Sequence, residues 1–219
     1  MKRPYIVLFL LLIILSVLFI AAQADIPDNA NAPSSQRLSV ATFAGGCFWC
    51  TESEFEKLQG VHSVISGYTG GSKKNPSYRQ VARGKTSHQE SVQVHYDPAL
   101  ISYEKLLQAF WRMINPTDAG GQFYDRGHQY STAIFYHSED QRRLAEQSIV
   151  QLESSGRYDK PIVTPVVAAG VFYPAEDYHQ DYYKHNPVRY KVYRWNSGRD
   201  QYLKKIWGKE LTLEAQQTQ

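Results

Sequence analysis

Beyond residue 37, the order of apolar and polar positions switches repeatedly between the two-residue period of strands and the longer period of helices. The clearest alternation runs from Glu90 to Tyr96, where every second residue shares one face. The clearest helical spacing runs from Tyr103 to Ile114, behind Ser102 as an N-cap. The full pattern predicts strands over residues 38–43, 61–68, 90–96, 132–136 and 162–167. It predicts helices over 47–58 and 103–114, and a third that starts at a capping box of Ser138 and Gln141 and ends before Gly156.

The order of these elements indicates the fold class. The longer strands and helices follow one another as βαββαβ rather than as a long βα series. This order predicts an α/β (α+β) two-layer sandwich with a mixed sheet and a ferredoxin-like core. Pro165 lies within the last predicted strand and favours a position at the edge of the sheet, because proline cannot donate a hydrogen bond to a neighbouring strand.

The N-terminus has a different pattern from the rest of the chain. Two basic residues precede an apolar run over residues 5–22, which closes on Ala22-Gln23-Ala24. These are the parts of a secretory signal, so we expect residues 1–24 to be a cleaved signal peptide. The run is also long enough for residues 5–22 to remain as a membrane anchor. Both alternatives predict an exported protein, periplasmic or otherwise extracytoplasmic, with a polar linker at 25–37 and a folded domain at 38–210.

Charge and length limit the class of protein. Residues 1–24 carry Lys2 and Arg3 and no acid, so their removal lowers the formal net charge from +3 to +1. A nearly neutral protein is not expected to bind nucleic acid. The remaining chain, about 190 residues, is long enough to bury a core without a disulfide, and we expect a monomer.

The chain has two cysteines, Cys47 and Cys50, in the run Gly-Gly-Cys-Phe-Trp-Cys at 45–50. A bridge that closes so small a loop adds little stability, so a redox role is favoured over a structural one. Cys47 is expected in the first turn of a helix, where unpaired N–H groups and the helix dipole would stabilise a thiolate. Cys50 falls on the same helix face, within reach of a disulfide. Phe48 and Trp49 supply apolar surface beside the nucleophile.

Glu90 shares its strand face with Val92, Val94 and Tyr96, which is the face expected to be buried. A buried carboxyl either finds a partner or stays protonated with a raised pKa. A neutral acid of this kind can act as a proton donor. The alternative is a glutamate at the start of an edge strand that reaches solvent.

Several segments together resemble the type A peptide methionine sulfoxide reductases. The resemblance covers residues 42 to about 186 in the order of that family. Its matching blocks are Ala-Gly-Gly-Cys-Phe-Trp at 44–49 with Glu52, Gly-Tyr-Thr-Gly-Gly at 67–71, Tyr78, Glu90, Asn-Pro-Thr at 115–117, Asp-Arg-Gly-His-Gln-Tyr at 125–130, and the run from Phe172 to Tyr183.

The resemblance implies a reaction and a set of roles. Cys47 attacks the sulfur of the S epimer of methionine sulfoxide and becomes a sulfenic acid, while a protonated Glu90 gives its proton to the oxygen. Phe48 and Trp49 form the pocket for the substrate's methyl group. Hydrogen bonds to the oxygen or its water come from a polar network that comprises Tyr78, Asp125 and Tyr130. The implied substrates are oxidised proteins, peptides and free methionine sulfoxide, and the implied process is the repair of oxidative damage.

The chain departs from many members of that family at its C-terminal end. Many members regenerate the nucleophile with a cysteine near the C-terminus, but this chain has none after Cys50. Our hypothesis is that Cys50 captures the sulfenic acid and that a thioredoxin-like donor reduces the disulfide; the other possibility is that the donor attacks Cys47 directly. We expect no bound cofactor and no metal. No role is assigned to the tail residues Tyr190, Tyr193 and Trp195.

Two other classes of function fit parts of the sequence. An exported thiol–disulfide oxidoreductase would use the same Cys-x-x-Cys pair at the start of a helix, although the bulky Phe-Trp spacer is unusual for that class. A metal-binding module would combine the cysteines with His128 and His179, but no regular ligand spacing supports it.

Overall fold

The computed structural model describes residues 38–213. The predicted signal or anchor at 1–24 and the linker at 25–37 lie outside these residues. None of the helices within 38–213 is both long and apolar enough to cross a membrane. The strands are β1 (Ser39–Gly45), β2 (Val61–Thr69), β3 (Gln89–Tyr96), β4 (Gly121–Gln122), β5 (Asp125–Arg126), β6 (Thr132–Tyr136), β7 (Val166–Ala168) and β8 (Tyr173–Pro174). The helices are α2 (Phe48–Phe55), α3 (Tyr78–Ala82), α4 (Tyr103–Trp111), α5 (Glu139–Ser154), α6 (Tyr182–His185), α7 (Pro187–Asn196) and α8 (Arg199–Trp207).

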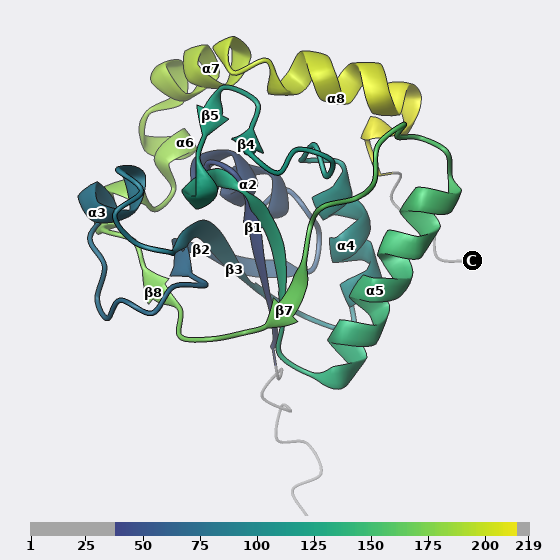
Figure 1. Ribbon diagram of the computed structural model, residues 1–219, viewed down its shortest axis with the longest axis horizontal. Helices are drawn as coiled ribbons and strands as arrows, with labels where there is room; N and C mark the ends of the chain where they lie inside the picture. The colour runs from purple at the N-terminus through teal and green to yellow at the C-terminus, as the bar shows by residue number, and fades with distance from the viewer. Residues whose placement is uncertain (1–37, 214–219) are drawn as a thin grey trace, which may run out of the picture. The chain divides into compact units, whose positions relative to one another are not determined.

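The main sheet has six strands in the order β7-β6-β1-β3-β2-β8 (Figure 1). Its neighbours pair antiparallel except β6 and β7, which are parallel, so the sheet is mixed. The four longer strands β1, β2, β3 and β6, with α2 and α4 between them, form the expected βαββαβ unit. The predicted fold class is therefore confirmed.

The last predicted strand, 162–167, is shorter than expected but lies at the expected edge. β7 covers only Val166–Ala168 and pairs with β6 alone. Pro165 precedes it, and its carbonyl accepts a hydrogen bond from Ile134 N–H at 2.9 Å. Because proline has no N–H to donate, regular pairing begins only after this residue.

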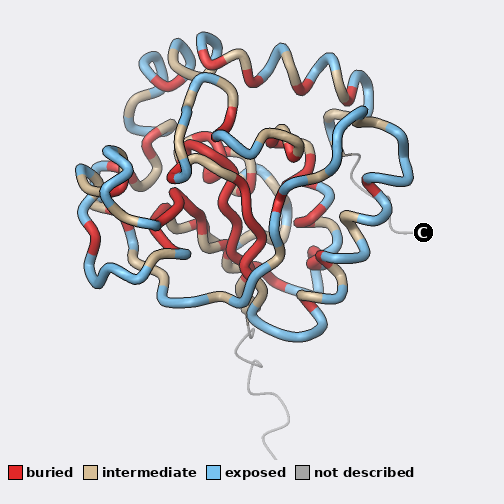
Figure 2. Tube along the Cα trace, in the orientation of Figure 1, coloured by how far each residue is buried: buried red, intermediate tan, exposed pale blue. Residues whose placement is uncertain are grey.

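The core lies between the sheet and the helices α2, α4 and α5. Phe43 of β1 stacks between Phe55 of α2 and Phe110 of α4, with ring centroids 5.0 and 4.9 Å away. Figure 2 shows the central strands as largely buried, while α5 and α8 keep an exposed outer surface. Burial of these aromatic side chains contributes a large share of the stability of a core, about 25 cal/mol for each Å² of apolar surface removed from water.

The helix starts follow the sequence signals in part. The hydroxyl groups of Ser102 and Ser138 accept the backbone N–H groups of Lys105 and Gln141, as expected of N-caps. The capping box at Ser138 is only half correct, because the Gln141 side chain accepts from His137 N–H and not from Ser138 N–H. Gln141 also donates to Val40 O, so its side chain joins α5 to the start of β1.

The C-terminal helices α6, α7 and α8 follow β8, and the sequence pattern predicted none of them. In Figure 1, α7 lies beside the hairpin of β4 and β5, close to the start of α2. Tyr193 of α7 confirms this proximity, because its hydroxyl donates to Asp125 of β5 at 2.5 Å. The helices therefore bring the C-terminal part of the domain to the cysteine pair.

Candidate active site

A cavity of about 70 Å³ lies at the start of α2. Seven of its lining residues are among the eight site residues expected from the sequence, and the eighth expected residue, Cys50, lies buried next to it. Residues from distant parts of the chain meet here: Cys47, Phe48, Trp49, Tyr78, Glu90, Asp125, Tyr130 and Tyr193.

Cys47 is the N-cap residue of α2, one position before the helix begins. The preceding Gly46 has φ +83°, a backbone conformation that favours glycine. A Cβ at this position would lie 2.6 Å from the Cβ of Gln122, so the turn also needs a residue without a side chain. This turn directs Cys47 into the cavity, where its side chain is 5% exposed.

The expectation that the helix start holds Cys47 as a thiolate is wrong for the substrate-free protein. Burial raises the pKa of the Cys47 thiol well above its usual range, and the hydrogen bond with Cys50 and the carboxylates of Glu90 and Asp125 act in the same direction. The physical reason is visible at the helix start. The Phe48 N–H donates to Glu90 Oε2 at 3.1 Å, so this helix-start donor serves the carboxyl group.

Cys50 lies one turn into α2 and is also buried. It packs against Tyr182 of α6 and Tyr190 of α7. The hydrogen bond from Cys47, with smaller contributions from the charges of Arg199 and Arg194, lowers the pKa of Cys50 to about 7 against the effect of burial. Within the pair, Cys50 therefore loses its proton more easily than Cys47.

Glu90 lies on the buried face of β3 and is 2% exposed, which excludes the alternative of an edge glutamate that reaches solvent. Burial raises the pKa of Glu90 to about 8, and the hydrogen bond from Phe48 N–H opposes this rise. The carboxyl group is therefore protonated at neutral pH, and it lines the same cavity as Cys47.

The apolar wall of the cavity consists of Phe48 and Trp49. The indole of Trp49 stacks on Tyr182, with centroids 3.7 Å apart, and donates to His179 Nδ1 at 3.1 Å. His179 also contacts the ring of Tyr78, at 4.2 Å between centroids. Burial lowers the pKa of His179 to about 4, so the imidazole is neutral and can accept this hydrogen bond at neutral pH.

The polar wall consists of Tyr78, Tyr130 and Asp125. Burial raises the pKa of both tyrosines, so their hydroxyl groups remain donors. Burial also raises the pKa of Asp125, whereas the hydrogen bond from Tyr193 and the charge of Arg199 lower it. Tyr193 had no assigned role in the sequence. Its only signal in the sequence was an aromatic side chain beyond the last block of the family resemblance, which ends near residue 186.

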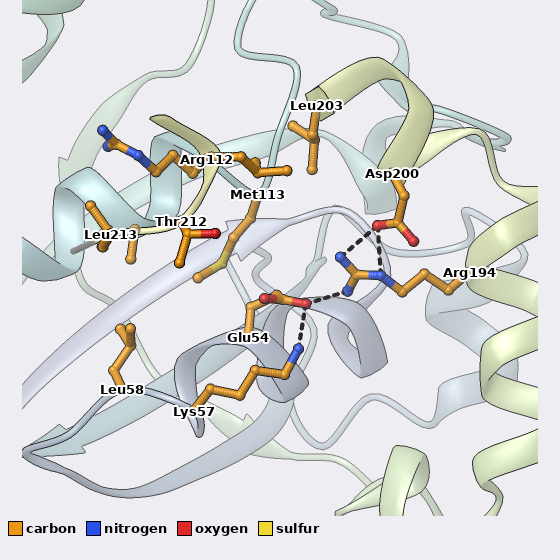
Figure 3. A pocket seen from close by; sticks show the side chains of 12 residues that line it. Glu54, Lys57, Leu58, Arg112, Met113, Arg194, Asp200, Leu203, Thr212 and Leu213 are labelled. Carbon is orange, nitrogen blue, oxygen red and sulfur yellow. Dashed lines mark hydrogen bonds and ion pairs between the residues drawn. The ribbon is translucent and has the colours of Figure 1, made fainter. Parts of the chain in front are cut away.

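A second cavity, of about 420 Å³, lies near the ends of α2 and α4 and beside α8 (Figure 3). None of the expected site residues lines it. Most of its charged groups are paired: Arg194 lies between Glu54 and Asp200, at 2.7 and 2.8 Å. The larger space therefore holds none of the reactive groups expected from the sequence.

The histidines considered for a metal site have other partners. His128 Nε2 lies 3.0 Å from the carbonyl of Ser87, and His179 accepts from Trp49. Within residues 38–213, no group of three or more His, Cys, Asp or Glu side chains is arranged to hold a metal ion.

Comparison with known proteins gives a consistent result. The sequence profile of the family "Peptide methionine sulfoxide reductase" matches residues 39–211. A peptide methionine sulfoxide reductase MsrA of Halalkalibacterium halodurans is 54% identical over 174 residues, which cover 80% of this chain and 99% of that protein. The MsrA/MsrB protein of Vibrio cholerae is 51% identical over 187 residues, which cover 85% of this chain and 50% of that protein. The chain thus spans half the length of this second relative.

Solved structures agree with the sequence relatives. The crystal structure of reduced Mxr1 from Saccharomyces cerevisiae is similar with a TM-score of 0.64 and 32% identity. The match covers 69% of this chain and 87% of the yeast chain.

Proposed function

Because the chain belongs to the peptide methionine sulfoxide reductase family, and reduces methionine sulfoxide as a peptide-methionine (S)-S-oxide reductase in protein repair, we propose that Cys47 is its nucleophile and Glu90 its proton donor. The observation that carries this proposal is that both residues line one buried cavity of about 70 Å³. Nucleophilic attack on sulfur and protonation of oxygen can then occur on the same S=O group.

The first step is balanced without a bound cofactor. The Cys47 sulfur bonds to the sulfoxide sulfur as Glu90 and the Cys47 thiol each give a proton to the S=O oxygen, which leaves as water. A water molecule then attacks the Cys47 sulfur, the bond between the two sulfurs breaks, and one proton returns to Glu90. The substrate sulfur gains two electrons and leaves as methionine, while Cys47 loses two electrons and becomes the sulfenic acid. Phe48 and Trp49 contact the methyl group, and hydrogen bonds from Tyr78 and Tyr130 hold the oxygen. Asp125 orients this polar wall through its bond with Tyr193.

A single-turnover experiment tests these roles. Reduced protein is mixed with the separated S and R epimers of a methionine sulfoxide peptide, and the methionine formed is measured. We expect one equivalent from the S epimer and none from the R epimer. Cys47→Ser should form no methionine, and Cys50→Ser should still form one equivalent. Loss of the first equivalent in folded Cys50→Ser would contradict the assignment of Cys47 as the nucleophile.

Cys50 is the second part of the proposal. Its thiolate attacks the Cys47 sulfur of the sulfenic acid, and the S–S bond forms as the S–O bond breaks. The departing hydroxide takes up the proton that the Cys50 thiol had lost and leaves as water. A thioredoxin-like dithiol then reduces the disulfide and becomes oxidised itself. Supporting observations are that both thiols are buried three residues apart at the start of α2 and that Cys50 has the lower pKa.

Turnover with a thioredoxin-like donor separates this route from direct attack on Cys47. In Cys50→Ser, the steady-state rate with thioredoxin should fall at least about a hundredfold, while dithiothreitol-driven turnover remains measurable. Unchanged turnover with thioredoxin would show that the donor attacks Cys47 directly.

Export of the protein is proposed from the sequence of residues 1–24 alone. The mass of the protein purified from the producing cell tests it. Cleavage after Ala24 leaves a chain that begins at Asp25, whereas retention of residues 5–22 keeps the chain with the membrane fraction. Full-length protein in the cytosol would contradict export.

A further inference from the structure

Arg199, the first residue of α8, is a buried cation that forms no ion pair with a carboxylate within residues 38–213. Its side chain is 1% exposed. The guanidinium donates to the backbone carbonyls of Met113 and Gly45, the latter at 3.2 Å, and lies 4.6 Å from the ring centroid of Phe123. Among the residues that the structure describes, no carboxylate forms an ion pair with it. Its positive charge is therefore not neutralised by direct contact.

Arg194 of α7 provides a contrast on the same side of α2. Its guanidinium is held between the carboxylates of Glu54 and Asp200, as Figure 3 shows. It also donates to the hydroxyl of Tyr190, which packs against Cys50. Because two carboxylates offset its charge at short distance, its remaining field at the cysteines is weaker than that of Arg199.

Arg199 lies directly behind the turn that carries Cys47. Its Nη2 bonds to the carbonyl of Gly45, and a Cβ on Gly46 would lie only 3.1 Å from that nitrogen. The guanidinium is therefore fixed against the backbone of the turn that precedes α2, at Gly45, five residues before Cys50.

We propose that Arg199 is a positioning residue of the reductase, whose unneutralised charge stabilises the Cys50 thiolate that captures the Cys47 sulfenic acid. The inference rests on the proposed capture by Cys50 and deepens it. The C-terminal helices contain no cysteine that could resolve Cys47. They instead supply the charge that stabilises the thiolate of Cys50.

The other groups that face Cys50 do not supply this charge. Cys47 donates a hydrogen bond to it, and the charge of Asp125 raises the pKa of Cys50. Burial raises the pKa of Tyr190 and of Tyr193, so both are neutral phenols on α7, which packs beside Cys50. Of the two arginines, Arg199 lowers the pKa of Cys50 more than Arg194 does.

The charge of Arg199 favours both the capture of the sulfenic acid and the later reduction of the disulfide. During capture, the Cys50 thiolate forms the S–S bond as the S–O bond of the sulfenic acid breaks and the departing oxygen leaves as water. During reduction by a dithiol, attack on Cys47 expels Cys50 as a thiolate, and a leaving thiol with a lower pKa departs faster. A nearby positive charge stabilises the anion in each case.

The test compares charged and neutral replacements of Arg199. Arg199→Lys keeps the charge and Arg199→Gln removes it, while both can donate to a backbone carbonyl. Arg199→Met is a second neutral variant whose straight side chain can pack on Phe123 if the Gln variant does not fold. Arg194→Gln is the matched control, because its charge is already offset by Glu54 and Asp200.

Two measurements are made on reduced, folded protein between pH 5 and 10. Thiolate absorbance gives the midpoint of the first cysteine to ionise, and rapid quenching with mass analysis gives the rate of Cys47–Cys50 disulfide formation after one equivalent of sulfoxide. In the neutral variants the midpoint should rise by about one unit or more, and capture at pH 7 should slow about tenfold. Arg199→Lys should stay within about threefold of the original protein, and Arg194→Gln should shift less than Arg199→Gln.

The remaining outcomes overturn the inference. Equal slowing in Arg199→Lys and Arg199→Gln with an unchanged midpoint would mean that Arg199 only supports the backbone. An unchanged midpoint and rate in the neutral variants would mean that its charge has no role. If the original protein itself forms no Cys47–Cys50 disulfide, the proposed capture fails first, and this result is distinguishable because it does not depend on Arg199.

Discussion

The indole of Trp49 lies flat on the ring of Tyr182, with the two planes inclined by 6°. Trp49 also donates to His179, which is 130 residues away in the sequence. Both partners come from the segment after β8, so this segment fixes the orientation of one wall of the cavity. The apolar pocket is therefore built by two parts of the chain, and one of them does not contain the cysteines.

Substitution of Tyr182 should weaken substrate binding more than it slows the chemical step. Tyr182→Leu removes a stacking contact of the kind that contributes about 0.5–1.5 kcal/mol beyond simple burial. We expect KM for a sulfoxide peptide to rise about two- to tenfold, with a smaller change in kcat. Trp195→Leu is the control, because Trp195 is 68% exposed. Equal changes in the two variants would show that Tyr182 does not position Trp49.

The pH dependence of the first turnover should report the protonation of Glu90. Burial raises the pKa of Glu90 from its ordinary value near 4.5 to about 8, so the proton-donating form is present below pH 8 and is lost above it. The single-turnover rate at saturating substrate should therefore fall about tenfold per pH unit above this pH. Glu90→Gln should lower the rate about 10²- to 10⁴-fold and remove this dependence. If the rate of Glu90→Gln still fell above pH 8, the pH dependence would belong to another group.

Glu52 should affect the stability of the fold but not the decrease of the single-turnover rate above pH 8. It is fully buried, its Oε1 accepts from Asp181 N–H at 3.2 Å, and burial raises its pKa to about 8. Between pH 4.5 and 8, the folded state keeps a proton that the unfolded state has lost, so stability decreases as pH rises through this range.

Urea unfolding at several pH values measures this contribution. Glu52→Gln keeps an acceptor for Asp181 but cannot ionise. Its stability relative to the original protein should increase between pH 5 and pH 8, by at most about 4 kcal/mol. Parallel stability curves for the two proteins would contradict a buried, protonated Glu52.

Loss of the Tyr193 hydroxyl should impair the first turnover through Asp125. The hydrogen bond from Tyr193 lowers the pKa of Asp125, so Tyr193→Phe should raise this pKa further and loosen the polar wall. We expect kcat/KM to fall about tenfold, the size of effect expected when one charge-assisted hydrogen bond is lost. Tyr183→Phe is the matched control, because its hydroxyl bonds to Glu56 outside the cavity. An unchanged kcat/KM in Tyr193→Phe would show that Asp125 does not need this partner.

The sequence predicted the sheet well because a two-residue period can be read without tertiary information. The alternation in residues 90–96 placed Glu90 on the buried face, and the structure confirms this position. The pKa of Cys47 could not be predicted in the same way. The start of a helix can be recognised in the sequence. The hydrogen bond from Phe48 N–H to Glu90, 42 residues away, cannot, because it depends on how β3 packs beside α2.

The C-terminal helices were missed because their pattern is dominated by charged and aromatic residues without a continuous apolar stripe. Helix α7 begins at Pro187, and only Tyr190 of its ten residues is buried. Arg199 would normally be assigned to the surface on the basis of its residue type. Only the packing of α8 against the turn at Gly45 shows that its charge is buried behind the cysteines.

The cavity at the start of α2 has a volume of about 70 Å³, room for only a few water molecules. A space of this size fits the end of one side chain. We therefore expect selection among damaged proteins to depend little on neighbouring sequence and to depend on how far each oxidised residue protrudes from its own fold.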